Sequence, residues 1–137
     1  MKRWLYTAVF LLICTTFGGC TSLKTTEKKT QDTVFEIMEE EHIPAEMKEW
    51  IETHKDKPFQ IAFSDRKYWY IAQGYGEKPC RGYEIEMDQC YETKHMIAVH
   101  TLLYGPRDGE KNPGGSSFPY MVVRTKWKDK MVVFLNK

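Results

Sequence analysis

The spacing of hydrophobic residues changes near Lys57, from a helical period to an alternating one. Before it, two groups of apolar residues recur at positions that share one helix face: Val34, Ile37 and Met38, then Met47, Trp50 and Ile51. Pro44 separates them, and proline is tolerated in the first turn of a helix but not in its interior. We therefore predict one short helix that ends near His42 and a second that starts at Pro44.

After residue 57, apolar and polar residues alternate in short runs, which is typical of β-strands. The runs cover residues 59–63, 68–72, 83–88, 96–104, 120–127 and 131–135. Parallel pairs need long crossover connections, so hairpin-like order favours an antiparallel sheet. The predicted fold class is α+β and mainly β, with two short N-terminal helices packed on an antiparallel sheet of about six strands that can curl into a sandwich.

The first twenty residues have the order of an export signal. Lys2 and Arg3 precede an apolar run at residues 4–13, and a short segment with small residues leads to Cys20. The apolar run is shorter than the roughly 20 residues that a membrane-spanning helix needs. We predict a signal peptide over residues 1–19.

Gly18 and Gly19 before Cys20 resemble the bacterial lipobox, in which the cysteine thiol receives a lipid. Phe17 departs from the aliphatic residue that is usual there. The resemblance implies lipidation at Cys20 and attachment to the extracytoplasmic face of the cell membrane. Secretion with an unmodified Cys20 is the alternative.

Residues 20–32 are polar and lysine-rich, so we expect a tether, followed by one globular domain over residues 33–137. Without residues 1–19 the chain has 18 Lys and Arg against 19 Asp and Glu. This near-neutral charge excludes nucleic acid as an expected partner.

Most of the glycine and proline lies in two segments, residues 74–83 (GYGEKPCRGY) and 104–120 (YGPRDGEKNPGGSSFPY). Turn chemistry explains such residues, but long loops on a rigid sheet also carry binding sites. Both interpretations stay open from composition alone.

The sequence of the first loop and its following strand, residues 76–86 (GEKPCRGYEIE), resembles the PrcB C-terminal domain family. Pro106, the pair Pro113 and Gly114, and residues 118–123 (FPYMVV) continue the resemblance, which covers residues 70–124. Phe118 replaces a usual tyrosine, and Cys80 and Arg81 replace a usual pair of small residues. The resemblance implies an exported or lipid-anchored protein that binds or stabilises another envelope protein, with a protease complex as the example that gives the family its name.

Residues 78–83 (KPCRGY) also resemble a loop of chagasin-type cysteine-peptidase inhibitors, Asn-Pro-Thr-Thr-Gly-Tyr. Arg81 is bulky where that family has threonine, and no Arg-Pro-Trp loop is present. This resemblance makes a peptidase inhibitor the alternative function.

The two loops contain or flank the residues that we predict to bind another protein. We expect Tyr75 and Tyr83 to be the exposed pair beside the first loop, since tyrosine combines apolar area with a polar tip. The full set is Tyr75, Lys78, Pro79, Arg81, Gly82, Tyr83, Pro119 and Tyr120.

Cys80 and Cys90 are the cysteines of the expected domain. An exported protein favours a disulfide between them, but a straight strand over residues 82–88 would hold them about 33 Å apart. A bridge needs Cα atoms only about 4.4–6.8 Å apart. The disulfide therefore requires the loop to fold back near Gly82.

The sequence shows little evidence of a catalytic or metal-binding motif. The four histidines have no metal-ligand spacing, and no Gly-x-Ser-x-Gly motif surrounds Ser116 and Ser117. Glu84, Glu86 and Asp88 are more typical of a solvated strand face than of a carboxylate pair for acid-base catalysis. We expect a protein that is not an enzyme, without a metal or cofactor.

Overall fold

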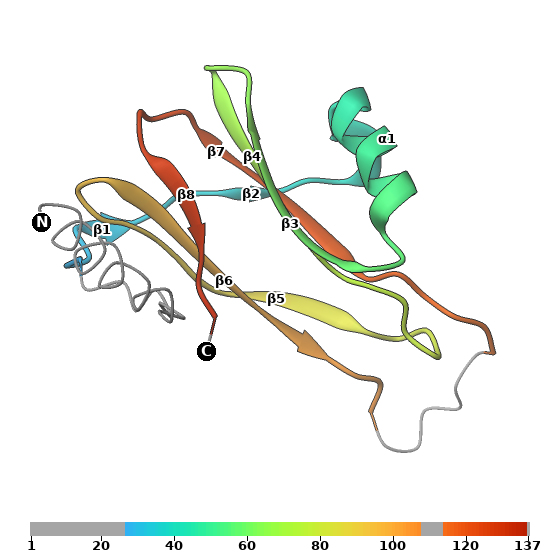
Figure 1. Cartoon of the computed structure of the whole chain (residues 1–137). Helices are drawn as coiled ribbons and strands as arrows, with labels where there is room; N and C mark the ends of the chain where they lie inside the picture. Colours follow the sequence, from blue (N-terminus) through green and yellow to red (C-terminus); the bar gives the residue numbers. More distant parts are fainter. Residues whose placement is uncertain (1–26, 108–113, 137) are drawn as a thin grey trace, which may run out of the picture.

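The computed structural model describes residues 27–107 and 114–136, which form two four-stranded sheets and one α-helix in three layers (Figure 1). The predicted signal peptide over residues 1–19 and the predicted lipidation site Cys20 lie outside these residues. Within the described part, no helix is long and apolar enough to cross a membrane.

The helix-side sheet has the strand order β2-β7-β4-β3 and is antiparallel throughout. Its strands are β2 (Glu36–Ile37), β3 (Pro58–Ser64), β4 (Tyr68–Tyr75) and β7 (Tyr120–Lys126). The outer sheet has the order β1-β5-β6-β8. Its strands are β1 (Gln31–Asp32), β5 (Glu84–Glu92), β6 (Met96–Tyr104) and β8 (Met131–Phe134).

Strand β4 is buried on both faces because its residues alternate between two hydrophobic clusters. Tyr70 and Ala72 pack with Met47 and Ile51 of the helix α1 (Ala45–His54). Ile71, on the opposite face, packs with Val99 and other residues between the two sheets. Burying one large aliphatic side chain contributes about 1.5–3 kcal/mol, so each cluster stabilises the sheet substantially.

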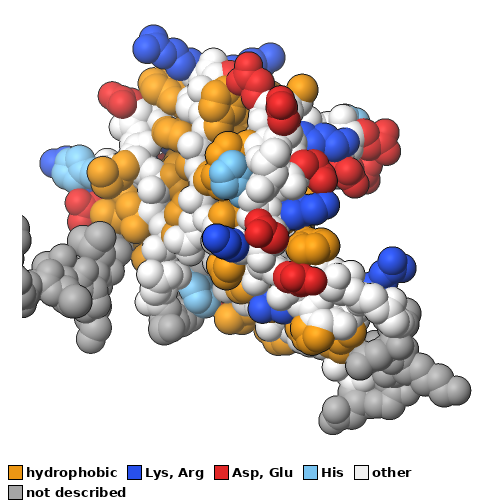
Figure 2. All heavy atoms as spheres, turned by 45° about the vertical axis from the view of Figure 1, so that its right-hand side comes forward, with side chains coloured by type: hydrophobic (Ala, Val, Ile, Leu, Met, Phe, Trp, Pro, Cys, Tyr) orange, Lys and Arg blue, Asp and Glu red, His pale blue; other side chains and the backbone are white. Residues whose placement is uncertain are grey.

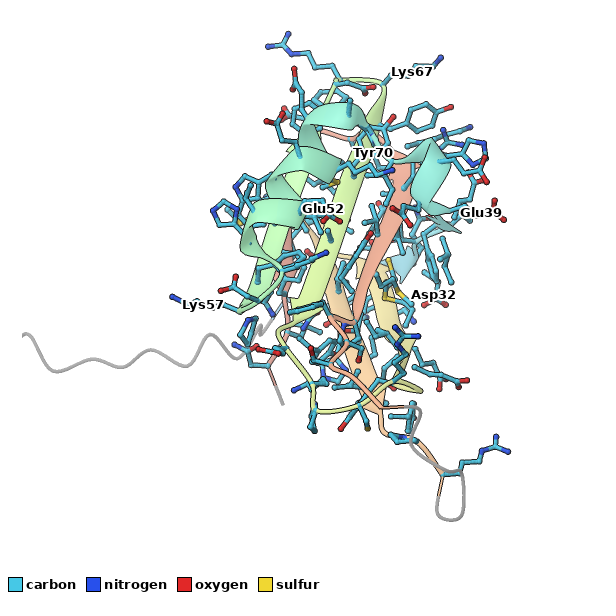
Figure 3. The ribbon with its side chains drawn as sticks, turned by 90° about the vertical axis from the view of Figure 1, so that its right-hand side faces the viewer. Asp32, Glu39, Glu52, Lys57, Lys67 and Tyr70 are labelled. Atoms are coloured by element: carbon cyan, nitrogen blue, oxygen red, sulfur yellow. The ribbon has the colours of Figure 1, made fainter. Side chains whose placement is uncertain are left out.

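Helix α1 begins directly after Pro44, whose ring fixes a backbone angle suited to the start of a helix. Its buried residues are Met47 and Ile51, four positions apart on one face. Figure 3 shows α1 over β3 and β4, on the side of the sheet that carries Tyr70.

The first of the two predicted helices is absent, so the predicted fold class is wrong in this part. The segment before Pro44 forms β1, β2 and a single 3-10 turn (Glu40–His42) instead. Val34 is 89% exposed and Ile37 57%, so the apolar residues that suggested a helix share no buried face. The segment instead crosses from the outer sheet to the helix-side sheet. The edges of β5 and β7 supply hydrogen-bond partners for its backbone N–H and carbonyl groups.

All six strand segments expected after residue 57 are present, but they do not form one antiparallel sheet. Strand β7 pairs with β4 rather than with its neighbour β6, and β6 pairs with β8 in parallel. The prediction of a wholly antiparallel sheet rested on the lack of long crossover connections. In the structure, β7 lies in the other sheet and itself connects the parallel strands β6 and β8.

The end of the predicted tether is also part of the domain. Gln31 and Asp32 pair with β5, and Thr30 donates its N–H to the Glu92 carbonyl at 2.8 Å. The Glu27 carboxylate accepts hydrogen bonds from Thr93 and His95. Residues 27–32 are therefore held against the β5–β6 turn.

Glu92 is 3% exposed and joins β5 to the turn between β7 and β8. Its carboxylate accepts hydrogen bonds from Lys128 and, at 2.8 Å, from Lys130. Burial alone would raise the pKa of Glu92, but the two ammonium groups outweigh burial and hold the pKa below its ordinary value.

Replacing Gly74 with alanine should destabilise the protein by about 1–3 kcal/mol. Gly74 lies opposite Phe59 in the β3–β4 pair, and an added Cβ would come within 2.2 Å of the buried Phe59 ring. Urea unfolding followed by circular dichroism measures the effect. Gly114→Ala is the control, since nothing lies within 4 Å of its Cβ position; equal stabilities of the two variants would contradict the packing at Gly74.

Glu92→Gln should lower the free energy of unfolding at pH 7 by about 1.5–3 kcal/mol, because it removes two charge-assisted hydrogen bonds. The folded-state pKa of Glu92 is depressed. Its contribution is therefore present above the ordinary carboxyl pKa of about 4.3 and lost as the pH falls through the lower folded-state pKa. Urea titrations from pH 7 to pH 3 should show wild type and variant converging in acid; a constant difference would argue against the ion pairs.

Candidate binding site

The two glycine- and proline-rich loops are joined by backbone hydrogen bonds. Lys78 donates its N–H to the Ser117 carbonyl at 2.8 Å, and Ser117 donates to the Lys78 carbonyl at 3.0 Å. The Ser117 hydroxyl donates to the Cys80 carbonyl at 2.6 Å, and Tyr75 donates its N–H to the Pro119 carbonyl at 3.0 Å. The described parts of the loops therefore form one ordered end of the molecule.

Gly82 allows the first loop to approach the second closely. Its φ of +94° is a conformation that other residues resist, and an added Cβ would lie 3.2 Å from the Cβ of Pro106. A Cβ at Gly105 would lie 3.6 Å from the Tyr83 ring. This contact places Tyr83 at the start of β5, beside the second loop.

A hollow of about 320 Å³ lies beside the place where the two loops meet. Most of its lining residues are hydrophobic, and it is called the apolar hollow below. One wall comes from the N-terminal segment, the other from β5 and from the start of β7. It is lined by Ile37, Met38, Glu40, Ile43, Tyr83, Ile85, Pro119, Tyr120, Met121 and Val122.

Both tyrosines of the hollow are protonated at neutral pH. Burial is the largest cause that raises the pKa of Tyr83, and the neighbouring Cys80 adds to it. Burial also raises the pKa of Tyr120, with smaller contributions from Glu40 and Glu52. Each ring therefore offers apolar area with a neutral hydroxyl group that can donate a hydrogen bond.

Charge is confined to the rim of the hollow. Glu40 is the one charged residue in its lining, is exposed, and lies 3.4 Å from the Lys48 ammonium group. Figure 2 shows hydrophobic side chains exposed between acidic and basic ones on the face that it turns forward. An apolar surface with a polar rim is typical of protein contact sites.

Three of the residues nominated from the sequence, Tyr83, Pro119 and Tyr120, meet at the apolar hollow. Tyr75 does not, because it points between the sheets, where its hydroxyl is 2.6 Å from that of Thr101. The expectation that Tyr75 and Tyr83 form an exposed pair is therefore wrong.

The remaining nominated residues lie in the first loop, outside the lining of the hollow. Pro79, Arg81 and Gly82 are exposed, and Lys78 is half-buried through its pairing with Ser117. The first loop thus presents its own separate surface, next to the hollow.

Sequence reasoning missed the N-terminal wall of the hollow. The hydrophobic spacing predicts a helix at Ile37 and Met38. In the structure, Ile37 pairs with Val123 of β7 and Met38 donates its N–H to the Val122 carbonyl. A pair of apolar residues followed by Glu39–Glu41 gave no signal of a strand, because a two-residue strand is too short to show alternation.

Cys80 and Cys90 are free thiols, so the suggested disulfide between them is absent from the structure. Cys90 packs between the sheets, whereas Cys80 lies in the loop beyond the opposite end of β5. The strand is extended between them, and no fold-back at Gly82 brings the sulfurs together. Burial raises the pKa of the Cys90 thiol to about 11.

Groups of three or more histidine, cysteine, aspartate or glutamate side chains that could hold a metal ion do not occur among the described residues. Asp88 and His100 form a pair at 2.7 Å on the outer sheet.

Comparison with known proteins identifies part of the chain. Residues 69–126 match the family described as PrcB C-terminal, which confirms the resemblance predicted for residues 70–124. No curated protein and no solved structure matches the chain. The matched segment runs from β4 to β7, so it holds Tyr83, Pro119 and Tyr120 but not the N-terminal wall of the hollow.

Alkylation should detect Cys80 and Cys90 as two free thiols when the non-reduced protein is unfolded in urea. In the folded protein Cys90 should react slowly at pH 7.5, because it is buried and its pKa is about 11. Peptide mass mapping after iodoacetamide treatment measures both. Recovery of a Cys80–Cys90 linked peptide would contradict the free thiols.

Proposed function

With residues 69–126 identified as a PrcB C-terminal segment, we propose that this protein is a non-enzymatic surface lipoprotein that binds or stabilises another envelope protein, such as a protease complex. The observation that carries the proposal is the convergence of Tyr83, Pro119 and Tyr120 with the exposed Ile37 on one apolar hollow.

The chemistry of the hollow supports contact with a protein chain. Tyrosine, proline, isoleucine and methionine side chains provide apolar area, and the two neutral hydroxyl groups provide donors for a partner's backbone carbonyls. Ile37 is more than half exposed, so covering it with a partner would remove apolar surface from water.

Lipidation at Cys20 would keep this site close to the membrane. Glu27, which contacts the β5–β6 turn, is seven positions after Cys20. At about 3.3–3.6 Å per extended residue, the domain would begin within about 25 Å of the lipid. That distance suits a partner that is itself held at the envelope.

Ile37→Asp should reduce partner binding about tenfold or more, because it places a carboxylate in the apolar hollow. Val34→Asp is the matched control, since Val34 belongs to the same N-terminal segment, is 89% exposed and does not line the hollow. Quantitative capture of partners from native membranes, with full-length lipidated protein as bait, measures the difference. Thermal unfolding should be similar for the two variants.

Equal loss of the captured partner with both variants, or no loss with either, would contradict the assignment of the apolar hollow as the binding site. Stoichiometric inhibition of papain by the purified protein would instead favour the chagasin-like inhibitor. Incubation at equal molar amounts and an assay of residual peptidase activity decide this point.

A further inference from the structure

We infer that the free edge of β5 next to the apolar hollow receives an extended segment of the partner, in which apolar residues alternate with lysine or arginine. This inference rests on the proposed function and names the chemistry of the bound segment. Two features of the described residues, an unpaired strand edge and alternating side-chain chemistry along it, carry the inference.

The first feature is the unpaired edge. Strand β5 pairs with β6 on both sides of a register shift between Met87 and Gln89. On its other side, β1 pairs only with Tyr91 and Glu92. Within the described part of the chain, no strand pairs with residues 84–87 on that side. Unpaired edges with free backbone groups are the usual sites at which a peptide adds a strand.

The chain itself demonstrates that this edge accepts a strand. Thr33 donates its N–H to the Cys90 carbonyl at 3.0 Å, and this is the last backbone hydrogen bond between the described N-terminal segment and β5. The segment then leaves the outer sheet, and the Val34 carbonyl accepts a hydrogen bond from Thr125 of β7 at 2.7 Å. A guest strand can continue where the segment departs.

The second feature is the alternation of side chains along residues 84–87. Ile85 lines the apolar hollow, and Met87 packs against the cluster between the sheets. Glu84 and Glu86 are exposed on the opposite face, where they line a second hollow with Tyr104 and Arg107.

In an added strand, residues across from Ile85 and Met87 would face the apolar hollow, and those between them would lie beside Glu84 and Glu86. The lining of the second hollow has two carboxylates and one guanidinium, so its acidic excess favours a basic guest. The complementary segment therefore alternates apolar and basic residues over about four to six positions.

The same charges disfavour a second copy of this chain as the occupant. Two β5 edges paired antiparallel would bring Glu84 and Glu86 of one copy beside those of the other. Like charges on neighbouring strands are destabilising. A basic segment from a different protein has no such penalty.

A synthetic peptide can test the edge without the natural partner. The probe is a fluorescein-labelled peptide of eight residues with alternating valine and lysine, added to the full-length protein in detergent and followed by fluorescence anisotropy. It should bind at least about tenfold more tightly than the same peptide with glutamate in place of lysine. A peptide with four valines followed by four lysines controls for charge alone and should also bind more weakly.

Methylation of backbone nitrogens in the probe distinguishes strand addition from nonspecific binding of the peptide to the protein surface. Only every second residue of an added strand donates its N–H to the neighbouring edge. N-methylation of one alternate set should therefore abolish binding, while methylation of the other set should leave it nearly unchanged.

Charge reversal locates the binding on the protein. Glu84→Lys combined with Glu86→Lys should weaken the basic probe about tenfold and improve binding of the glutamate peptide. Glu49→Lys combined with Asp129→Lys changes the net charge equally at two exposed positions, on α1 and in the β7–β8 turn, and should leave the preference for the basic probe unchanged. Circular dichroism checks that each variant is folded.

Equal effects of the two methylation patterns, or equal effects of the two double variants, would overturn the inference. A dimer that forms through this edge and is displaced by the probe would replace the proposed occupant with a second copy. If Ile37→Asp loses the membrane partner while Glu84→Lys/Glu86→Lys keeps it, the proposed function stands and the strand-addition inference fails.

Discussion

Burial of both faces of the helix-side sheet is the constraint on which the other parts of the structure depend. Along β4, Tyr70 and Ala72 require a cover on one side, and Ile71 requires one on the other. The short helix α1 supplies the first cover and the outer sheet supplies the second. A sheet buried on only one face would leave one of these apolar sets in water, at a cost of about 1.5–3 kcal/mol for each large side chain.

This three-layer arrangement also creates the candidate site. To reach α1, the N-terminal segment leaves the outer sheet after Thr33 and joins β7 through Glu36 and Ile37. Its departure uncovers the edge of β5 and at the same time supplies one wall of the apolar hollow. The other wall belongs to the segment that matches the PrcB C-terminal family, so the site lies at the boundary between the matched segment and a part of the chain outside it.

Local patterns in the sequence predicted the strands well and their partners poorly. The composition of residues 96–104 and 120–127, rich in β-branched and aromatic residues between turn-rich segments, indicates that each run is a strand. It contains no information about whether β7 lies beside β6 or beside β4. The same limit applies to Tyr75 and Tyr83: both flank the first loop, but one hydroxyl contacts Thr101 between the sheets while the other ring faces the hollow.

The sequence alone determined the positions of the six strands after residue 57, the helix that follows Pro44, the two turn-rich loops and the resemblance to the PrcB C-terminal family. These features depend on local spacing or on short motifs, which a single chain displays directly. Tertiary structure alone decided that residues 33–42 form no α-helix, that β6 and β8 run parallel, and that Cys80 and Cys90 stay apart. Those outcomes depend on which distant edges and faces meet, because burial and backbone pairing between remote segments outweigh weak local preferences.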